Sequence, residues 1–185
     1  MKRTVVLAAF EPFGKRRRNA SWEAARRVGE ATGITPVQLP VRFAALQREV
    51  RKLLAGKPAV LLLLGEAWTA KKLRVERVAL NLVDARIPDN GRKQPRDLPV
   101  VVGGPPAYFV TVDPKALAKL AGRVAPTELS LSAGAFACNA ALYQALHQAR
   151  GTQVGFIHVP SSPRAVKPLQ VAKALVRVVE ALQRG

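Results

Sequence analysis

One cysteine and two histidines are the side chains of this 185-residue chain best suited to nucleophilic chemistry. Cys138 follows the segment 132–137 and precedes a helical pattern, so its sulfur could lie at a helix N-terminus. There the positive end of the helix dipole and free backbone N–H groups favour the thiolate, the form that attacks carbonyl carbons. A lone cysteine is nevertheless more often a small buried hydrophobic residue, and position alone favours that interpretation.

A nucleophilic thiol needs a base, and only the two histidines can supply one. His158 follows the apolar segment Val154–Ile157, so we expect it at the carboxyl end of a strand, where α/β proteins gather their ligands. His147 lies nine residues after Cys138 in the same predicted helix, too far along the axis for its ring to reach the sulfur. A histidine at a strand end is also commonly a packing residue, so the pairing of Cys138 with His158 is a hypothesis.

An acid that holds the imidazole in one tautomer would complete a catalytic triad. Sequence spacing does not choose among the candidates, which are Glu11, Glu66, Glu76, Asp84 and Asp89. The sequence has no His/Cys/Asp cluster with metal-ligand spacing, which argues against a metal site. It also lacks the Gly-x-Ser-x-Gly elbow of serine hydrolases.

The elements that must position these residues alternate between apolar strands and amphipathic helices. Val- and Leu-rich segments predict buried strands at 4–9, 59–64 and 154–159. Helical periodicity predicts helices at 21–31, 43–54, 114–121, 139–149 and 167–182, with the first ending near Gly33 and Asp113 capping the third. This alternation is typical of an α/β fold, a three-layer α/β/α sandwich around a mostly parallel, mixed sheet. We expect residues 1–185 to form one domain.

Two segments are harder to assign. Residues 75–82 alternate less cleanly and are interpreted as a strand or an extended arm at the active site. Residues 84–106 are rich in Pro, Gly, Asp and Asn. A loop of that length inside a compact domain is usually functional or mobile rather than a plain connection.

The composition favours a globular protein, since 49% of the residues are hydrophobic and 23% are charged. A net charge of +18 raises the alternative of a protein that binds nucleic acid or another polyanion. Only Lys15–Arg18 forms a dense basic run, and the other cations are interspersed with acids. Zinc-finger spacing and aromatic RNA-binding signatures are missing, so we expect no specific nucleic-acid groove.

The sequence also predicts a cytoplasmic location. Cys138 has no partner for an internal disulfide, and such a thiol is best preserved in a reducing compartment. Residues 2–10 look faintly like a secretory leader but are better interpreted as a first buried strand. The apolar run Pro58–Leu64 is too short to span a bilayer, so no membrane association is expected.

Four blocks of sequence, in order, resemble the pyroglutamyl-peptidase I family, cysteine peptidases also called pyrrolidone-carboxylate peptidases. The second block is the most specific, and together they span nearly the whole chain. They are 10–14 (FEPFG) with 19–24 (NASWEA), 76–81 (ERVALN) with 84–90 (DARIPDN) and 94–95 (QP), 132–134 (SAG) with 138–139 (CN), and 155–160 (GFIHVP).

The resemblance implies roles for individual residues. The family's Cys, His and Glu match Cys138, His158 and Glu76, which selects Glu76 from the open set of acids. The family's arginine near the catalytic cysteine matches Arg86, which would support the developing oxyanion. Its substrate pocket matches Phe10, Phe13, Ile87 and Phe136. Apolar walls suit pyroglutamate, a compact uncharged lactam.

The same resemblance implies an exopeptidase that removes N-terminal pyroglutamate through a thiol acyl-enzyme, without metal or organic cofactor, in a homodimer or homotetramer. This chain departs from the family at three places. The family's Gly-Gln-Ala-Gly-Gly-Arg is Gly65–Ala70 (GEAWTA) here, and the family's glutamine contributes to substrate binding. Lys15 stands where a second glycine is usual, and Ala137 replaces a larger aliphatic residue. Two alternatives stay open: a polyanion-binding protein on this scaffold with weakened catalysis, and a cysteine hydrolase of different acyl specificity.

Overall fold

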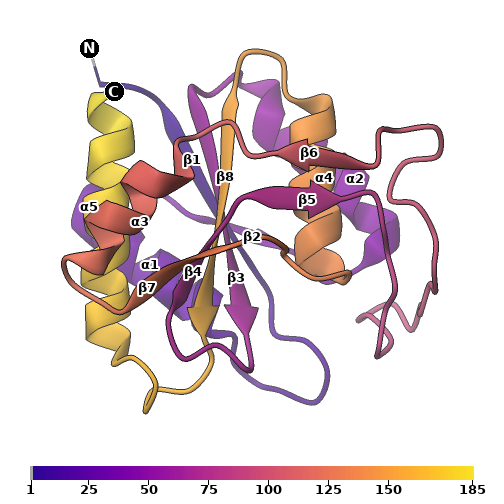
Figure 1. Cartoon of the computed structure of the whole chain (residues 1–185), viewed down its shortest axis with the longest axis horizontal. Coiled ribbons are helices and arrows are strands. Elements are labelled where there is room, and N and C mark those ends of the chain that lie inside the picture. The colour runs from indigo at the N-terminus through magenta and orange to yellow at the C-terminus, as the bar shows by residue number, and fades with distance from the viewer. Residues whose placement is uncertain (1) are drawn as a thin grey trace.

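A computed structural model describes residues 2–185 and has a mixed sheet at its centre (Figure 1). The sheet has six strands in the order β2-β1-β3-β8-β4-β7. The first four of these run parallel to one another, and β4 pairs antiparallel with β8 and parallel with β7. Their bounds are β1 Val5–Phe10, β2 Val37–Leu39, β3 Val60–Ala67, β4 Leu73–Glu76, β7 Thr127–Ser130 and β8 Gln153–Pro160.

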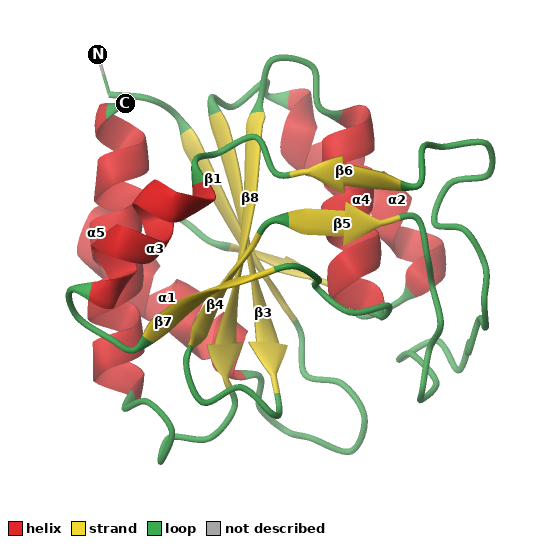
Figure 2. Ribbon diagram, in the orientation of Figure 1, coloured by secondary structure: helices red, strands yellow, loops and turns green. Residues whose placement is uncertain are grey.

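Helices cover both faces of this sheet, which makes the three layers visible in Figure 2. Three of them, α1 Ala20–Thr32, α3 Pro114–Gly122 and α5 Pro168–Arg184, pack together on one face. The other face carries α2 Phe43–Ala55 and α4 Ala137–Gln148. A separate antiparallel pair, β5 Val78–Leu80 and β6 Ala107–Phe109, packs against α4. The predicted α/β fold with a mostly parallel, mixed sheet is therefore confirmed.

The centre of the core is β3. The side chains of Val60–Leu64 are all fully buried, because helices cover both faces of a strand inside a parallel sheet. Burying one such side chain stabilises the fold by about 1.5–3 kcal/mol. This continuous apolar run is why the strand was predictable from its sequence.

Local signals explain where two helices begin and end. The side chain of Asn19 accepts a hydrogen bond of 2.9 Å from the backbone N–H of Ser21 at the start of α1. Gly33 ends α1 in the left-handed conformation, with φ of 76°. Asp113 caps α3, as predicted, by accepting from the N–H groups of Lys115 and Ala116 at 2.9 and 3.1 Å.

Some predicted elements differ from those observed. The segment 75–82 is two strands, β4 and β5, separated at Arg77, and they belong to different sheets. The short strands β2, β6 and β7 carry too few residues for a periodic pattern and were not predicted. Helix α4 begins at Ala137, so Cys138 lies inside its first turn. His158 lies within β8 near its carboxyl end, as predicted.

The ends of the described chain lie side by side, where the N–H of Arg3 donates to the carbonyl of Gln183 at 2.8 Å (Figure 1). Residues 84–106, all described, contain neither helix nor strand beyond a single bridge of Leu98 to Val83. Among residues 2–185, no helix combines the length and the apolar character that crossing a membrane requires.

Candidate active site

Cys138 is the second residue of α4 and is only partly buried. Phe136, the residue before the first turn, offers no capping side chain. The N–H groups of that turn therefore point toward the site with the positive end of the helix dipole, next to the sulfur. This placement agrees with the predicted position of the thiol at a helix N-terminus.

A buried amide anchors this end of α4. Asn139 has no exposed surface, and its side chain accepts from the N–H of Leu80 at 2.9 Å. Its amide group donates to the carbonyls of Leu80 and Leu82 at 2.8 and 2.9 Å. A buried side chain with its hydrogen bonds made in this way holds one orientation, and it fixes the helix start against the end of β5 and the residues just after it.

His158 and Glu76 meet across two antiparallel strands. His158 on β8 lies opposite Arg74 on β4, so Glu76, two residues on, is its diagonal neighbour on the same face of the sheet. Nδ1 of His158 lies 2.8 Å from Oε1 of Glu76, and both side chains are buried. Because a carboxylate only accepts, Nδ1 carries the proton and Nε2 remains for the sulfur.

Gly65 provides the space in which the thiol and the imidazole meet. A Cβ atom on Gly65 would lie 2.9 Å from Sγ of Cys138, 2.9 Å from Cδ2 of His158 and 2.7 Å from the ring of Phe156. All three distances are shorter than side chains tolerate, so only glycine fits here. Gly65 pairs with His158 in the parallel ladder of β3 and β8, which brings the site to the carboxyl ends of these strands.

The surroundings of His158 favour its charged form. Burial lowers the pKa of this imidazole, but the Cys138 thiolate, through charge and a hydrogen bond, and Glu76, through the same two effects, raise the pKa to about 9. A charged imidazole beside the sulfur can stabilise a thiolate through its charge and a hydrogen bond.

The structure separates Glu76 from the other four candidate acids. Glu11 accepts from the N–H of Val41 and from the amide of Asn90, at 3.0 and 2.7 Å. Asp84 pairs with Arg96 at 3.1 Å. Glu66 and Asp89 are buried and hold backbone and side-chain donors of the surrounding loops. Of the five, Glu76 alone contacts His158, and its Oε2 has no hydrogen-bond partner within residues 2–185.

Aromatic rings lie beside the sulfur. The ring of Phe13 is 5.8 Å from that of Phe136, two residues before Cys138, and Phe136 meets the edge of Phe43 at 5.3 Å. Phe10 is different, because it is 1% exposed and packs on Phe156 at 6.4 Å. Phe156 in turn lies 4.7 Å from the imidazole of His158. Phe13 and Phe136 are thus at the surface of the site, and Phe10 lies in the core behind it.

The loop that carries Arg86 and Ile87 is docked at the same end of the sheet. Near its start, the N–H of Asp84 donates to the carbonyl of Ala135, three residues before Cys138, at 2.9 Å. Asp89 accepts from the N–H of Phe43 at 2.7 Å and so caps α2, whose own Arg42 does not. Arg86 is exposed, and Ile87 approaches Gly14, where a Cβ would lie 3.9 Å away.

Glu66, on β3 directly after Gly65, forms a second buried polar cluster. Its side chain is 2% exposed, and it accepts from the guanidinium of Arg16 and from the N–H of Ala20 at the start of α1. The Arg16 guanidinium lies 5.3 Å from the centre of the Trp68 ring, and Trp68 stacks on Phe13 at 6.1 Å. The departure at 65–70 is therefore linked to the basic run at 15–18.

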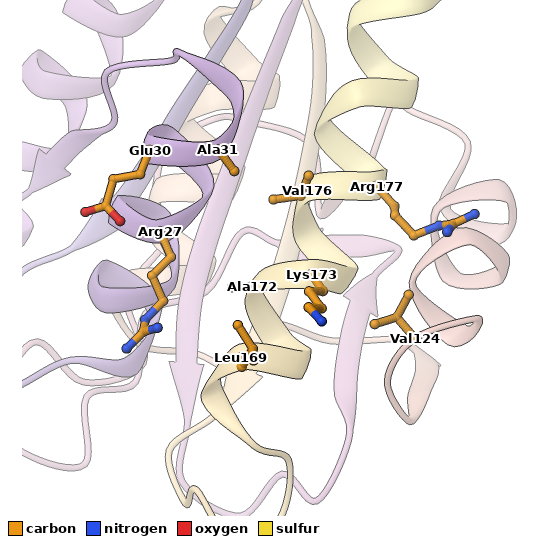
Figure 3. A pocket seen from close by; sticks show the side chains of 9 residues that line it. All are labelled: Arg27, Glu30, Ala31, Val124, Leu169, Ala172, Lys173, Val176 and Arg177. Atoms are coloured by element: carbon orange, nitrogen blue, oxygen red, sulfur yellow. The ribbon is translucent and has the colours of Figure 1, made fainter.

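A wide groove lies elsewhere, on the face that α1 and α5 cover (Figure 3). It has a volume of about 640 Å³, and its floor includes Ala31, Ala172 and Val176. Arg27, Lys173 and Arg177 stand around it. It holds none of the predicted site residues. Among residues 2–185, no three His, Cys, Asp or Glu side chains gather in a way that would hold a metal ion.

Comparison with known proteins decides the family. A family-wide sequence pattern described as pyroglutamyl peptidase matches residues 3–182. The chain belongs to the pyroglutamyl peptidase family. This confirms the resemblance, and it makes the chain a peptidase, a hydrolase acting on peptide bonds.

Individual relatives match this chain along most of their lengths. A pyrrolidone-carboxylate peptidase of Chromobacterium violaceum is 47% identical over 167 residues, covering 87% of this chain and 79% of the relative. One from Clavibacter michiganensis is 42% identical, covering 96% and 92%. The crystal structure of Bacillus amyloliquefaciens pyroglutamyl peptidase I superposes with a TM-score of 0.92 at 30% identity, covering 100% of this chain and 98% of that one.

Sequence reasoning missed three neighbours of the aromatic site. Phe43 was interpreted only as the start of a helix, and Arg16 only as part of a basic run. Asn139 was recognised as part of a block but without a role. The sequence did hold one signal for Phe43. Arg42 is a poor N-cap, so the N–H groups of a helix that begins at Phe43 need an acceptor from elsewhere in the fold.

Proposed function

We propose that this peptidase removes N-terminal pyroglutamate from peptides through a thioester acyl-enzyme on Cys138. The observation that carries the proposal is the hydrogen bond of 2.8 Å between Nδ1 of His158 and Oε1 of Glu76, with the Cys138 sulfur beside the same imidazole at Gly65. Thiol, imidazole and carboxylate in this order are the arrangement that nucleophilic catalysis requires.

In the first step the Cys138 thiolate attacks the pyroglutamyl carbonyl carbon. The developing oxyanion lies near the first turn of α4, whose N–H groups can stabilise it, with Arg86 as a supporting cation. The imidazolium of His158 gives its proton to the leaving amine nitrogen as the C–N bond breaks. Glu76 keeps Nδ1 protonated and stabilises the positive charge on the ring.

In the second step water hydrolyses the thioester. Neutral His158 takes a proton from the water, the resulting hydroxide forms the new C–O bond, and the C–S bond breaks. Free pyroglutamate leaves, and the thiolate and imidazolium are restored. The step requires no metal or organic cofactor.

The substrate slot is proposed to lie among Phe13, Phe136 and Ile87, with Phe10 forming the packed layer behind it. These apolar side chains suit an uncharged five-membered lactam. Peptides with any free N-terminal amine would place a charge against aromatic rings, at a cost in desolvation. This selects a blocked N-terminus.

The decisive experiment measures release of a chromophore from a pyroglutamyl amide, with alanyl and prolyl amides alongside. We expect release from the pyroglutamyl amide alone, and loss of at least 1,000-fold of the rate in Cys138→Ser. Turnover of another acyl amide in preference would instead favour the cysteine hydrolase of different specificity. The comparisons give the polyanion-binding alternative no support.

We also propose that the chain acts as one domain in the cytoplasm and assembles as a homodimer or homotetramer. Large apolar side chains stand open to solvent beside the β5–β6 pair, with Val102 and Phe109 exposed by 88% and 69%. Burial of such side chains favours association. Light scattering of the purified protein tests the proposed assembly, and a monomer at working concentration would contradict it.

A further inference from the structure

We propose that a basic rim selects peptides that carry acidic residues directly after the pyroglutamate. We define the basic rim as Lys15, Arg17 and Arg86, which are exposed on the two loops that border the aromatic site. The inference rests on the proposed function, and it concerns the part of the peptide that leaves.

The two loops meet at the mouth of the site. Ile87 approaches Gly14, where a Cβ would lie 3.9 Å from its Cδ1. The amide of Asn90 donates to Oε1 of Glu11 at 2.7 Å and to the carbonyl of Pro12 at 2.9 Å. Hydrogen bonds thus tie the loop of Arg86 to the loop of Lys15 and Arg17. A peptide whose first residue lies against Phe13 must pass between them.

Five acidic groups in these loops and at the adjoining strand ends are already occupied. Glu66 is paired with Arg16, Asp84 with Arg96 and Glu76 with His158. Glu11 and Asp89 accept hydrogen bonds from the backbone of neighbouring segments. None of them remains to neutralise the basic rim.

The cations of the basic rim, by contrast, have no counter-ion of their own in the described part of the chain. Arg16 and Arg18, in the same run, are paired with Glu66 and Glu23. Within residues 2–185, Lys15, Arg17 and Arg86 form no ion pair. The overall charge of +18 adds a positive field of longer range.

Pyroglutamyl peptides have no N-terminal charge, so the sign of the next side chains dominates their interaction with this rim. Charges at a surface act over about 8 Å at physiological ionic strength, which covers the first residues after the scissile bond. Steering by a charged cleft raises association rates by about tenfold or more at low salt. The preference should therefore reside in kcat/KM and weaken as salt is added.

The experiment uses three amidated peptides that differ only at the residue after pyroglutamate, which is Glu, Gln or Lys. For the wild-type chain we expect kcat/KM to fall in that order, by about tenfold overall at low salt, and the ratio to approach one in high salt. In the double variant Lys15→Gln, Arg17→Gln the ratio should shrink, with release from an uncharged pyroglutamyl anilide unchanged.

A matched control removes the same charge from the groove between α1 and α5. Lys173 and Arg177 stand there on α5, across the sheet from α4 (Figure 3). Lys173→Gln, Arg177→Gln should leave the preference as in the wild type. If the ratio of kcat/KM fell equally in both double variants, net charge and not the basic rim would set the preference.

Two further outcomes separate this inference from the proposed function. Equal kcat/KM for the Glu and Lys peptides, with the anilide still cleaved, would overturn the basic rim alone. Failure of the wild-type chain to cleave the anilide at all would overturn the proposed function and the basic rim together.

Discussion

Two buried glutamates, Glu66 on β3 and Glu76 on β4, illustrate opposite uses of a carboxylate. Glu66 has both oxygens engaged, one by the Arg16 guanidinium and the other by the N–H of Ala20. Glu76 uses one oxygen on His158 and leaves Oε2 without a partner in the described part of the chain. A fully satisfied carboxylate holds structure together, whereas an incompletely satisfied one beside a titratable group is typical of reactive sites.

The partners explain the difference. Arginine stays charged at every physiological pH, so its pair with Glu66 is permanent and joins β3 to α1 and to the loop before it. Histidine gains and loses a proton, so the pair of Glu76 with His158 changes its charge during a reaction. Both residues are buried, since Glu66 as a whole is 7% exposed and Glu76 is 1% exposed, so depth alone does not predict a role.

Among the changes that test this comparison of the two glutamates, Glu76→Gln should have the largest effect. The amide can still accept from Nδ1 of His158, but it no longer stabilises the imidazolium, so kcat for a pyroglutamyl amide should fall by about 100-fold or more. Steady-state kinetics measure this. The matched variant Glu66→Gln should keep kcat close to the wild-type value. Equal losses in both would show that the two regions do not differ as described.

The pH dependence of kcat/KM should also depend on Glu76. With the pKa of His158 raised to about 9, its proton remains available through neutral pH and is lost as pH rises through about 9. The alkaline limb in Glu76→Gln should move to lower pH, because a hydrogen bond to a charged acceptor and its attraction are removed. An unmoved limb would contradict the role of Glu76.

The contribution of His158 to the free energy of unfolding also depends on pH. Its pKa is higher in the folded chain than its ordinary value of 6.5, so that contribution is fully present below pH 6.5 and disappears as pH rises through about 9. Urea denaturation at several pH values measures it.

A smaller effect, on stability, is expected for Glu66→Ala. Loss of the hydrogen bonds to Arg16 and Ala20 should lower the free energy of unfolding by about 1–3 kcal/mol. Urea denaturation gives this value directly. Glu66→Gln should retain part of the hydrogen-bond network, so its free energy of unfolding should lie between those of the wild type and Glu66→Ala. A variant as stable as the wild type would mean that the cluster around Glu66 contributes little.

The smallest effect is expected for Trp68→Ala. This side chain is 57% exposed, and a cation–π contact at such a site contributes about 0.5–1 kcal/mol. We expect a modest rise in KM for pyroglutamyl amides with kcat retained, because Trp68 acts through Phe13. A fall in kcat with KM unchanged would contradict this.

Much of the fold could be predicted because its elements are long or strongly patterned. The buried run in β3, the amphipathic periodicity of the five helices and the cap at Asp113 each give a local signal that tertiary packing does not override. Strands β2, β6 and β7 have three or four residues each, and their pairing is decided by partners far away in sequence.

The candidate site was less accessible to such reasoning. Residue types alone gave the pairing of Cys138 with His158 only as a hypothesis and left five acids unranked, and the choice of Glu76 came from the family resemblance. In the structure the choice follows from β4 lying antiparallel beside β8. This pairing brings together two side chains that are 82 residues apart in the sequence. No periodic pattern in either segment encodes that neighbour.

Local sequence sufficed for what depends on short-range chemistry: which segments form strands and helices, where a thiol meets a helix start and which family the blocks belong to. The three-dimensional arrangement was needed for which acid faces the imidazole, why only glycine fits at position 65 and how Arg16 came to neutralise Glu66. The reason is physical. Propensity and hydrophobic periodicity act over a few residues, whereas the partner of a buried charge is selected by packing among segments that the sequence keeps far apart.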